Sequence, residues 1–280
     1  IYGLENPCHK MFKELFLTNN VSFKSIPLDE SGIIIEELKK HNVNIAYVTP
    51  SHQFPTGTIM SISRRTELLN WANENFNCYI IEDDYDSEFK YTGRPIPALK
   101  ANDINDKVIY LGSFSKSISP AIRVSYLVLP KELLNIYQKK LPYFICPVPT
   151  LNQKILYKFI KDGYFVKHIN KMRTLYKKKR EFLVNTIKKY SSEIFNKEIY
   201  IQGADAGLHL VIKLNQKINE KAFLKECLEN SLQLYSLEEY YLEETYNETS
   251  SFLLGYANLT NNEIDEGILL LLRILKKYYI

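Results

Sequence analysis

Through the first 130 residues, short apolar runs alternate with longer segments whose apolar residues recur at helical spacing. Runs such as IYGLEN, NIAYVTP and CYIIEDDY are nearly continuous in apolar residues, which is typical of strands buried in a parallel sheet. Segments such as 61–75 lie between these runs and show the spacing of an amphipathic helix. Strands that alternate with helices predict an α/β fold with a mostly parallel sheet, covered on both faces.

After residue 130 the pattern changes. The proline-rich segment PYFICPVPT predicts a bend, and helices are expected over 151–161 and 164–190. Short strands around one helix follow, and a last helix is expected at 263–279. This α+β arrangement predicts a smaller second domain. We expect a large domain at 1–155 and a small C-terminal domain at 156–280.

The segment at 108–130 combines two β-rich runs, VIYL and VSYLVL, with a turn that contains Lys116. We expect the two strands to carry this lysine to the edge of a hydrophobic sheet, where a low dielectric lowers the pKa of its amine. Such an amine can form an imine with a carbonyl. The hydroxyls of Ser113 and Ser115 and the cation of Arg123 are groups that a phosphate binds. The segment therefore suggests pyridoxal phosphate (PLP), with an exposed loop lysine as the alternative.

Two other strand ends carry compatible chemistry. In EDDYDSEF, at 82–89, a carboxylate directly after a buried strand can keep a pyridine nitrogen protonated, and Tyr85 can donate to a ring hydroxyl. In TPSHQFPTG, at 49–57, a proline-glycine turn could pass beneath a bound ring. A helix cap or solvated loop is the alternative for the first segment, and an ordinary βα loop for the second. In a parallel sheet, all three segments would meet at one edge.

Composition excludes several other classes. A net charge of +4 is too small to indicate nucleic-acid binding by this chain, and the basic run KKKR at 177–180 is interpreted as a solvated helix face. The four cysteines lack metal-ligand spacing, so we expect no metal site and free thiols in a reducing cytoplasm. No apolar run is long enough to span a membrane. Because the chain begins without methionine and almost inside a strand, we expect that an N-terminal portion precedes it.

The sequence resembles the fold-type I PLP-dependent enzymes, and more closely the aminotransferase-like domain of MocR/GabR-type transcription regulators of the GntR family. The similarity spans essentially the whole chain. It is carried by TPSHQFPTG, IIEDDYDSEFKYTGRPIPALK, VIYLGSFSKSISPAIRVSYLVLP, GYFVKHINKMRTLYKKKREFL, AGLHLVIKL and LLGYANLT. The resemblance implies the fold-type I PLP-dependent transferase fold.

The resemblance also implies roles for individual residues. Lys116 would form the internal aldimine with PLP, Asp83 would pair with the pyridine nitrogen, and Tyr85 would contact the ring hydroxyl. Ser113 and Arg123, beside Ser115, would bind the phosphate. Phe54 stands where many aminotransferases have an asparagine that touches the ring hydroxyl. His209 would lie near the cleft entrance, with a structural strand histidine as the alternative.

Two departures from the family pattern shape the expected function. The chain begins at what resembles the family's ENPGY segment, here ENPCH, whereas the regulators carry a winged helix-turn-helix domain and a phosphate-binding turn before it. In addition, no arginine occurs between Arg180 and Arg273, although a small-domain arginine usually binds the substrate carboxylate. A standard amino-acid substrate is therefore not expected.

We accordingly expect a PLP-binding effector and dimerisation domain of a bacterial transcription regulator. It would act as a cytoplasmic homodimer with vestigial or no transaminase turnover, and with PLP, or PLP plus an amine or amino-acid effector, as its ligand. DNA would be contacted only through the preceding domain. A free-standing aminotransferase of the aminoadipate or aromatic type is the alternative, and a fold that serves only dimerisation is a third hypothesis.

Overall fold

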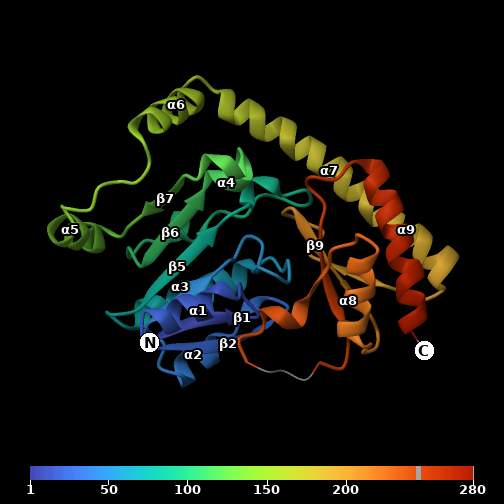
Figure 1. Ribbon diagram of the computed structural model, residues 1–280. Coiled ribbons are helices and arrows are strands. Elements are labelled where there is room, and N and C mark those ends of the chain that lie inside the picture. The colour runs from blue at the N-terminus through green and yellow to red at the C-terminus, as the bar shows by residue number, and fades with distance from the viewer. Residues whose placement is uncertain (244–246, 280) are drawn as a thin grey trace.

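The computed structural model describes residues 1–243 and 247–279 (Figure 1). These residues form a seven-stranded sheet and a four-stranded sheet. The strands of the first sheet are β1 (Tyr2–Asn6), β2 (Phe23–Asp29), β3 (Gly32–Ile33), β4 (Ile45–Val48), β5 (Tyr79–Asp84), β6 (Val108–Ser113) and β7 (Ser125–Val128). Those of the second sheet are β8 (Tyr200–Gln202), β9 (His209–Lys213), β10 (Tyr235–Ser236) and β11 (Ser251–Gly255). We call residues 1–128 the large lobe and residues 200–279 the small lobe.

The helices lie around and between these sheets. They are α1 (Met11–Thr18), α2 (Ile35–Lys40), α3 (Ile62–Glu74), α4 (Phe114–Ser117), α5 (Lys131–Lys140), α6 (Thr150–Lys161), α7 (Tyr164–Tyr190), α8 (Glu220–Glu229) and α9 (Asn261–Tyr278). The predicted helix at 164–190 is confirmed at both ends, and those at 151–161 and 263–279 agree to within two residues. The expected domain division between residues 155 and 156 falls within α6 and stays a prediction.

The large lobe has the strand order β3-β2-β1-β4-β5-β6-β7. Strands β2, β1, β4, β5 and β6 are parallel, whereas β3 and β7 pair antiparallel at the two edges. The predicted α/β class and mostly parallel sheet are therefore confirmed. The carboxyl ends of the parallel strands share one edge, and at that edge the loops after β1, β4, β5 and β6 come together.

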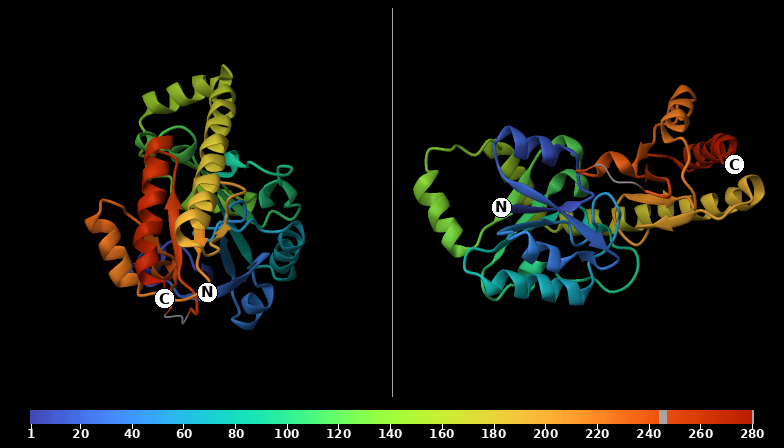
Figure 2. Two further views of the ribbon diagram at one scale, coloured as in Figure 1. Left: turned by 90° about the vertical axis from the view of Figure 1, so that its right-hand side faces the viewer. Right: turned by 90° about the horizontal axis from the view of Figure 1, so that it is seen from below.

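Apolar side chains cover both faces of this sheet. One cluster, which includes Ala46, Ile80 and Val108, packs against Leu38 of α2 and Leu68 of α3. The opposite face carries a smaller cluster beside α1, formed by Leu4, Cys8, Tyr47 and Leu242 with partly buried neighbours. Figure 2 shows α1 and α3 on opposite sides of the sheet.

The small lobe buries one face of its sheet. Leu210 and Ile212 of β9 and Phe252 and Leu254 of β11 lie in a core that α7, α8 and α9 complete. Because strand residues alternate between faces, His209 and Lys213 of β9 lie on the other face, which is turned toward the large lobe. Among the described residues, no helix combines the length and apolar composition needed to cross a membrane.

Two expectations about burial are wrong. The run VSYLVL was expected to be a strand of a hydrophobic sheet, but all four residues of β7 are exposed, because β7 is an antiparallel edge strand of the sheet. The basic run at 177–180 was interpreted as a solvated helix face, which holds only for the exposed Lys177 and Lys178. Instead, Lys179 donates a 2.7 Å hydrogen bond to the carbonyl of Ala257, and the guanidinium of Arg180 lies 5.5 Å from the ring centre of Tyr91.

Candidate functional site

The alternation of side chains along β5 separates its carboxylates. Glu82 points to the face covered by α3, where it is fully buried and accepts hydrogen bonds from the backbone N–H groups of Leu99 (2.8 Å) and Lys100 (2.9 Å). Asp83 points to the opposite face, where the hydroxyl of Tyr47 donates to its Oδ2. The period of two along the strand thus places Asp83 on the same face as α1 and the small lobe.

The carboxylate of Asp83 lies in a setting that disfavours its charge. Burial raises the pKa of Asp83, the hydrogen bond from Tyr47 opposes this shift, and the neighbouring acids Asp84 and Asp86 add to it. Among the described residues, Asp83 forms no ion pair. A half-buried carboxylate of this kind is stabilised by a cationic N–H group, which a protonated pyridine ring would supply.

The lysine segment follows the next strand. Ser113 ends β6 and caps the single turn of α4, because its hydroxyl accepts a 3.1 Å hydrogen bond from the N–H of Ser115. The chain then returns along β7, whose Ser125 lies opposite Ser113. This antiparallel return brings Arg123 close to the same turn. Arg123 has a left-handed backbone (φ +49°), a conformation of non-glycine residues that concentrates at functional sites.

The structure corrects the expected burial of Lys116. Its side chain is exposed, because α4 lies beyond the end of β6, outside the sheet layers. The positive charge of Lys116 is nevertheless close enough to lower the pKa values of His9 and His209, in both cases as a smaller contribution than burial. The amine therefore lies near the segment after β1 and near the small-lobe sheet. We call this region between the two lobes the Lys116 cleft.

The loop after β4 forms the aromatic wall of this cleft. Phe54 stacks on His9, with ring centres 5.4 Å apart and planes 29° apart. Its ring also meets Tyr85 edge to face at 6.3 Å and Tyr240 of the small lobe at 5.3 Å. From the sequence, Phe54 was predicted to contact the cofactor ring, whereas His9 was not predicted to be part of the site.

A buried polar cluster behind this wall joins the two lobes. Nδ1 of His52 lies 3.0 Å from Oδ2 of Asp86, and its Nε2 lies 3.3 Å from the carbonyl oxygen of Gly203. The ring of His209 packs on that of His52 at 4.5 Å. Tyr85 donates a 2.7 Å hydrogen bond to the carbonyl of His52. Tyr85 is thus linked, through His52, to the small lobe.

The residues of this cluster are of types that can also bind a metal ion. The ligand atoms of His52, Asp86 and His209 lie within 4.8 Å of one another, and all three residues are buried. Both ring nitrogens of His52 already face oxygen acceptors, so the geometry favours a hydrogen-bonded cluster. Burial lowers the pKa of His209 well below its usual value, and the neighbouring His52 adds to the effect. Sequence reasoning missed His52 and Asp86 here, although both lie inside motifs that it singled out.

Glycines allow the lobes to approach closely around this cluster. A Cβ atom on Gly57 would lie 2.4 Å from the Cα of Gly203, so the two backbones are in direct contact. A Cβ atom on Gly207 would lie 2.1 Å from Nδ1 of His52. Any residue with a side chain at Gly57 or Gly207 would clash with these atoms.

A buried acid lies beneath the cleft and was also missed. Glu5 of β1 accepts hydrogen bonds from the N–H (3.1 Å) and hydroxyl (2.7 Å) of Thr49 and from Gln53 (3.3 Å). Burial raises its pKa to about 7, against the opposing effect of these hydrogen bonds. The signal in the sequence was a glutamate within the apolar run IYGLEN, which indicates a buried acid.

Comparison with known proteins now identifies the family. Residues 4–269 match the family described as aminotransferase class I and II. This chain belongs to that family. The MocR/GabR-type resemblance is confirmed by curated relatives, and the fold by solved structures.

Two relatives and one solved structure show the kinds of protein to which this aminotransferase-family chain is similar. It is 38% identical to the uncharacterized HTH-type transcriptional regulator YdeL of Bacillus subtilis, over 95% of the chain and 56% of the relative. It is 27% identical to the probable rhizopine catabolism regulatory protein MocR of Rhizobium meliloti, over 96% and 53%. A crystal structure of Pyrococcus horikoshii kynurenine aminotransferase matches with a TM-score of 0.85 and 26% identity, over 99% and 69%. The chain spans about half the length of the curated relatives it matches.

The cofactor of this family, PLP, fits the residues present. Asp83 is a half-buried carboxylate that lacks an ion-pair partner in the described structure, and Tyr85 presents a hydroxyl nearby. Ser113, Ser115 and Arg123 gather at one turn beside Lys116, as hydroxyl and cationic groups suited to a phosphate. The strand β11, where an arginine for a substrate carboxylate was sought, consists of Ser, Phe, Leu, Leu and Gly.

Proposed function

We propose that this aminotransferase-family chain is the PLP-binding effector and dimerisation domain of a MocR-type transcription regulator. The observation that carries the proposal is the pairing of two neighbouring strands whose ends share one edge of the sheet, with Asp83 and Tyr85 at the end of β5 and the Lys116 turn after β6. The similarity to HTH-type regulators supports the regulatory role.

Each residue is proposed to act on a distinct part of the cofactor. The Lys116 amine would bind the aldehyde of PLP covalently. Asp83 would hold the pyridine nitrogen protonated, which makes the ring an electron sink when PLP is bound. Ser113, Ser115 and Arg123 would bind the phosphate. Since burial and nearby acids raise the pKa of Tyr85, its hydroxyl keeps its proton, which it would donate to the ring oxygen in place of the His52 carbonyl that it contacts in this structure.

Two features support little or no turnover. The cleft-facing side of β11 offers Leu253 and no cation, so a substrate carboxylate finds no bidentate partner there. Phe54 also replaces a polar contact with the cofactor ring by an apolar one. Ligand binding between the lobes would then change their arrangement, and through the dimer the position of preceding DNA-binding domains.

A homodimer is proposed on the basis of an exposed apolar surface. The segment after α5 exposes Tyr143 (91%), Phe144 (75%) and Ile145 (92%), and all four residues of β7 are exposed as well. Large apolar side chains exposed in this way suit a contact with another polypeptide. DNA would be bound only outside this chain.

Transamination separates this proposal from the alternative. The similarity to kynurenine aminotransferase favours a free-standing aminotransferase as the second candidate. PLP-loaded protein is mixed with common L-amino acids, and conversion of the cofactor to pyridoxamine phosphate is followed by absorbance and chromatography. The regulator proposal predicts negligible conversion during the assay. Rapid conversion would overturn it in favour of the aminotransferase.

A further inference from the structure

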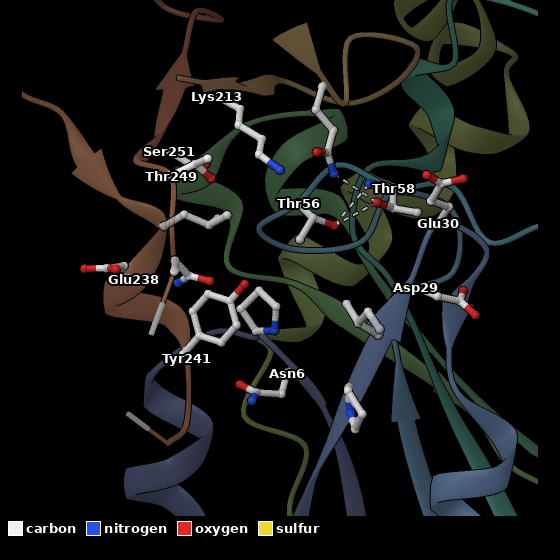
Figure 3. A pocket seen from close by; sticks show the side chains of 16 residues that line it. Asn6, Asp29, Glu30, Thr56, Thr58, Lys213, Glu238, Tyr241, Thr249 and Ser251 are labelled. Carbon is white, nitrogen blue, oxygen red and sulfur yellow. Dashed lines mark hydrogen bonds between the residues drawn. The ribbon is translucent and has the colours of Figure 1, made fainter. Parts of the chain in front are cut away.

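A second cavity, distinct from the Lys116 cleft, opens between the lobes (Figure 3). Its volume is about 490 Å³, within the range of small-molecule sites. The large lobe contributes the end of β1, the end of β2 and the end of the loop after β4, and the small lobe contributes β8, β9, β11 and residues of the segment 237–241. A molecule in this cavity would therefore contact both lobes.

The loop after β4 separates this cavity from the cofactor cleft. Phe54 faces the cleft, where it stacks on His9, whereas Thr56 and Thr58 line the cavity. Their hydroxyls are hydrogen-bonded to each other at 3.1 Å, and the side-chain amide of Gln202 donates to Thr58 at 3.3 Å. The cavity thus has a polar wall that carries none of the proposed cofactor ligands.

The small-lobe wall presents one cation. Lys213 lies on the face of β9 that is turned toward the large lobe, directly opposite Ser251 of β11. Figure 3 shows its side chain extended into the cavity, with Thr249 and Ser251 beside it. Among the described residues, the amine of Lys213 has no hydrogen-bond or ion-pair partner. Its charge is therefore available to an anionic group.

The large-lobe wall presents one free anion. Of the three acids that line the cavity, Asp29 and Glu238 are already ion-paired with basic side chains. Glu30 has no such partner in the described part of the chain. In Figure 3, Glu30 and Lys213 lie on opposite sides of the cavity, with Thr56 and Thr58 between them. One unpaired charge of each sign, on opposite sides of the same cavity, suits a small ligand that carries both charges.

We propose that this cavity binds a small zwitterion of the free amino-acid class. Its carboxylate would be held by Lys213 with the hydroxyl of Ser251, and its ammonium group by Glu30. Because the ligand contacts both lobes, it stabilises the arrangement in which they are close together. The site needs neither Lys116 nor the cofactor, so it goes beyond the proposed PLP-binding function.

Titration calorimetry on the PLP-free chain tests this site, since no amine can then react with the cofactor. The probes are the common L-amino acids, with acetate and ethylamine as ligands that carry one charge only. At least one amino acid is expected to bind the wild-type chain, more tightly than either single-charge ligand. Lys213→Met and Glu30→Gln are each expected to weaken its binding by about tenfold, since each removes one charge-assisted contact.

Matched controls are available on the surface. Lys221→Met and Glu198→Gln remove exposed charges that do not line the cavity, and are expected to leave the affinity unchanged. Circular dichroism checks that every variant is folded. The proposal is overturned if no amino acid binds, if either cavity variant binds like the wild type, or if acetate binds as tightly as the best amino acid. None of these outcomes bears on PLP binding, which is measured separately.

Discussion

Replacement of Gly207 by alanine tests the contact between the lobes. Gly207 has a left-handed backbone (φ +70°), and a Cβ atom there would lie 2.1 Å from Nδ1 of His52 and 2.5 Å from Oδ2 of Asp86. His52 and Asp86 are buried and hydrogen-bonded to each other, so neither can move aside freely. The new methyl group must therefore displace the cluster or separate the lobes.

The expected cost has two parts. A non-glycine residue in the left-handed region costs about 1–2 kcal/mol, and overpacking a well-packed site costs about 1–3 kcal/mol. Gly207→Ala should thus lower the free energy of unfolding by about 2–5 kcal/mol. Gly163→Ala is the matched control, because Gly163 has a similar φ of +77° but no heavy atom within 4 Å of its added Cβ. The control should show the conformational cost alone.

Guanidinium denaturation followed by circular dichroism measures both variants. The difference between them isolates the steric contact of Gly207 with His52 and Asp86, and should be about 1–3 kcal/mol. If Gly207→Ala destabilises the protein no more than Gly163→Ala, the lobes do not pack as described, and the proposed link from Tyr85 to the small lobe is refuted.

Two further predictions concern pH. The pKa of Glu5 is raised to about 7 from 4.5, so its contribution to stability is present below pH 4.5 and is lost as the pH rises through 7. Glu5→Gln should remove this loss, which amounts to about 3 kcal/mol in the free energy of unfolding. Chemical denaturation at several pH values measures it, and equal pH profiles for the wild type and the variant would contradict the prediction. The pKa of His209 lies well below 6.5, so its contribution is present above pH 6.5 and is lost as the pH falls below that value. His209→Gln should therefore lose less stability than the wild type between about pH 6.5 and about pH 5, and a steeper loss on acidification would show that His209 is not buried in neutral form.

Much of the fold could be predicted because its signals are local. Helical periodicity defined α7, and the alternation of apolar runs with helices predicted the parallel sheet. The exposure of β7 could not be predicted in the same way. A β-rich run has the same residue pattern in a central strand and in an edge strand, and only the pairing of the strands shows which of the two it is.

The candidate site was predicted in part for a similar reason. Asp83 lies near the end of β5 and Lys116 follows β6, and these two strands pair directly, so sheet topology places both residues at one edge of the sheet. The contact between His52 and the small lobe depends on how the two lobes pack, because Gly203 lies 151 residues further along the chain. The burial of Glu5 and the inward orientation of Arg180 likewise depend on tertiary packing. The exposure of Lys116 depends on the position of α4 beyond the sheet.

The central claim is that Lys116 holds PLP, and trapping that bond tests it most directly. The protein is incubated with PLP, reduced with borohydride and digested, and the peptides are analysed by mass spectrometry. The account predicts a phosphopyridoxyl group on Lys116 and loss of the cofactor's visible absorbance band in Lys116→Ala. Label on other lysines with none on Lys116, or an unchanged band in Lys116→Ala, would contradict it.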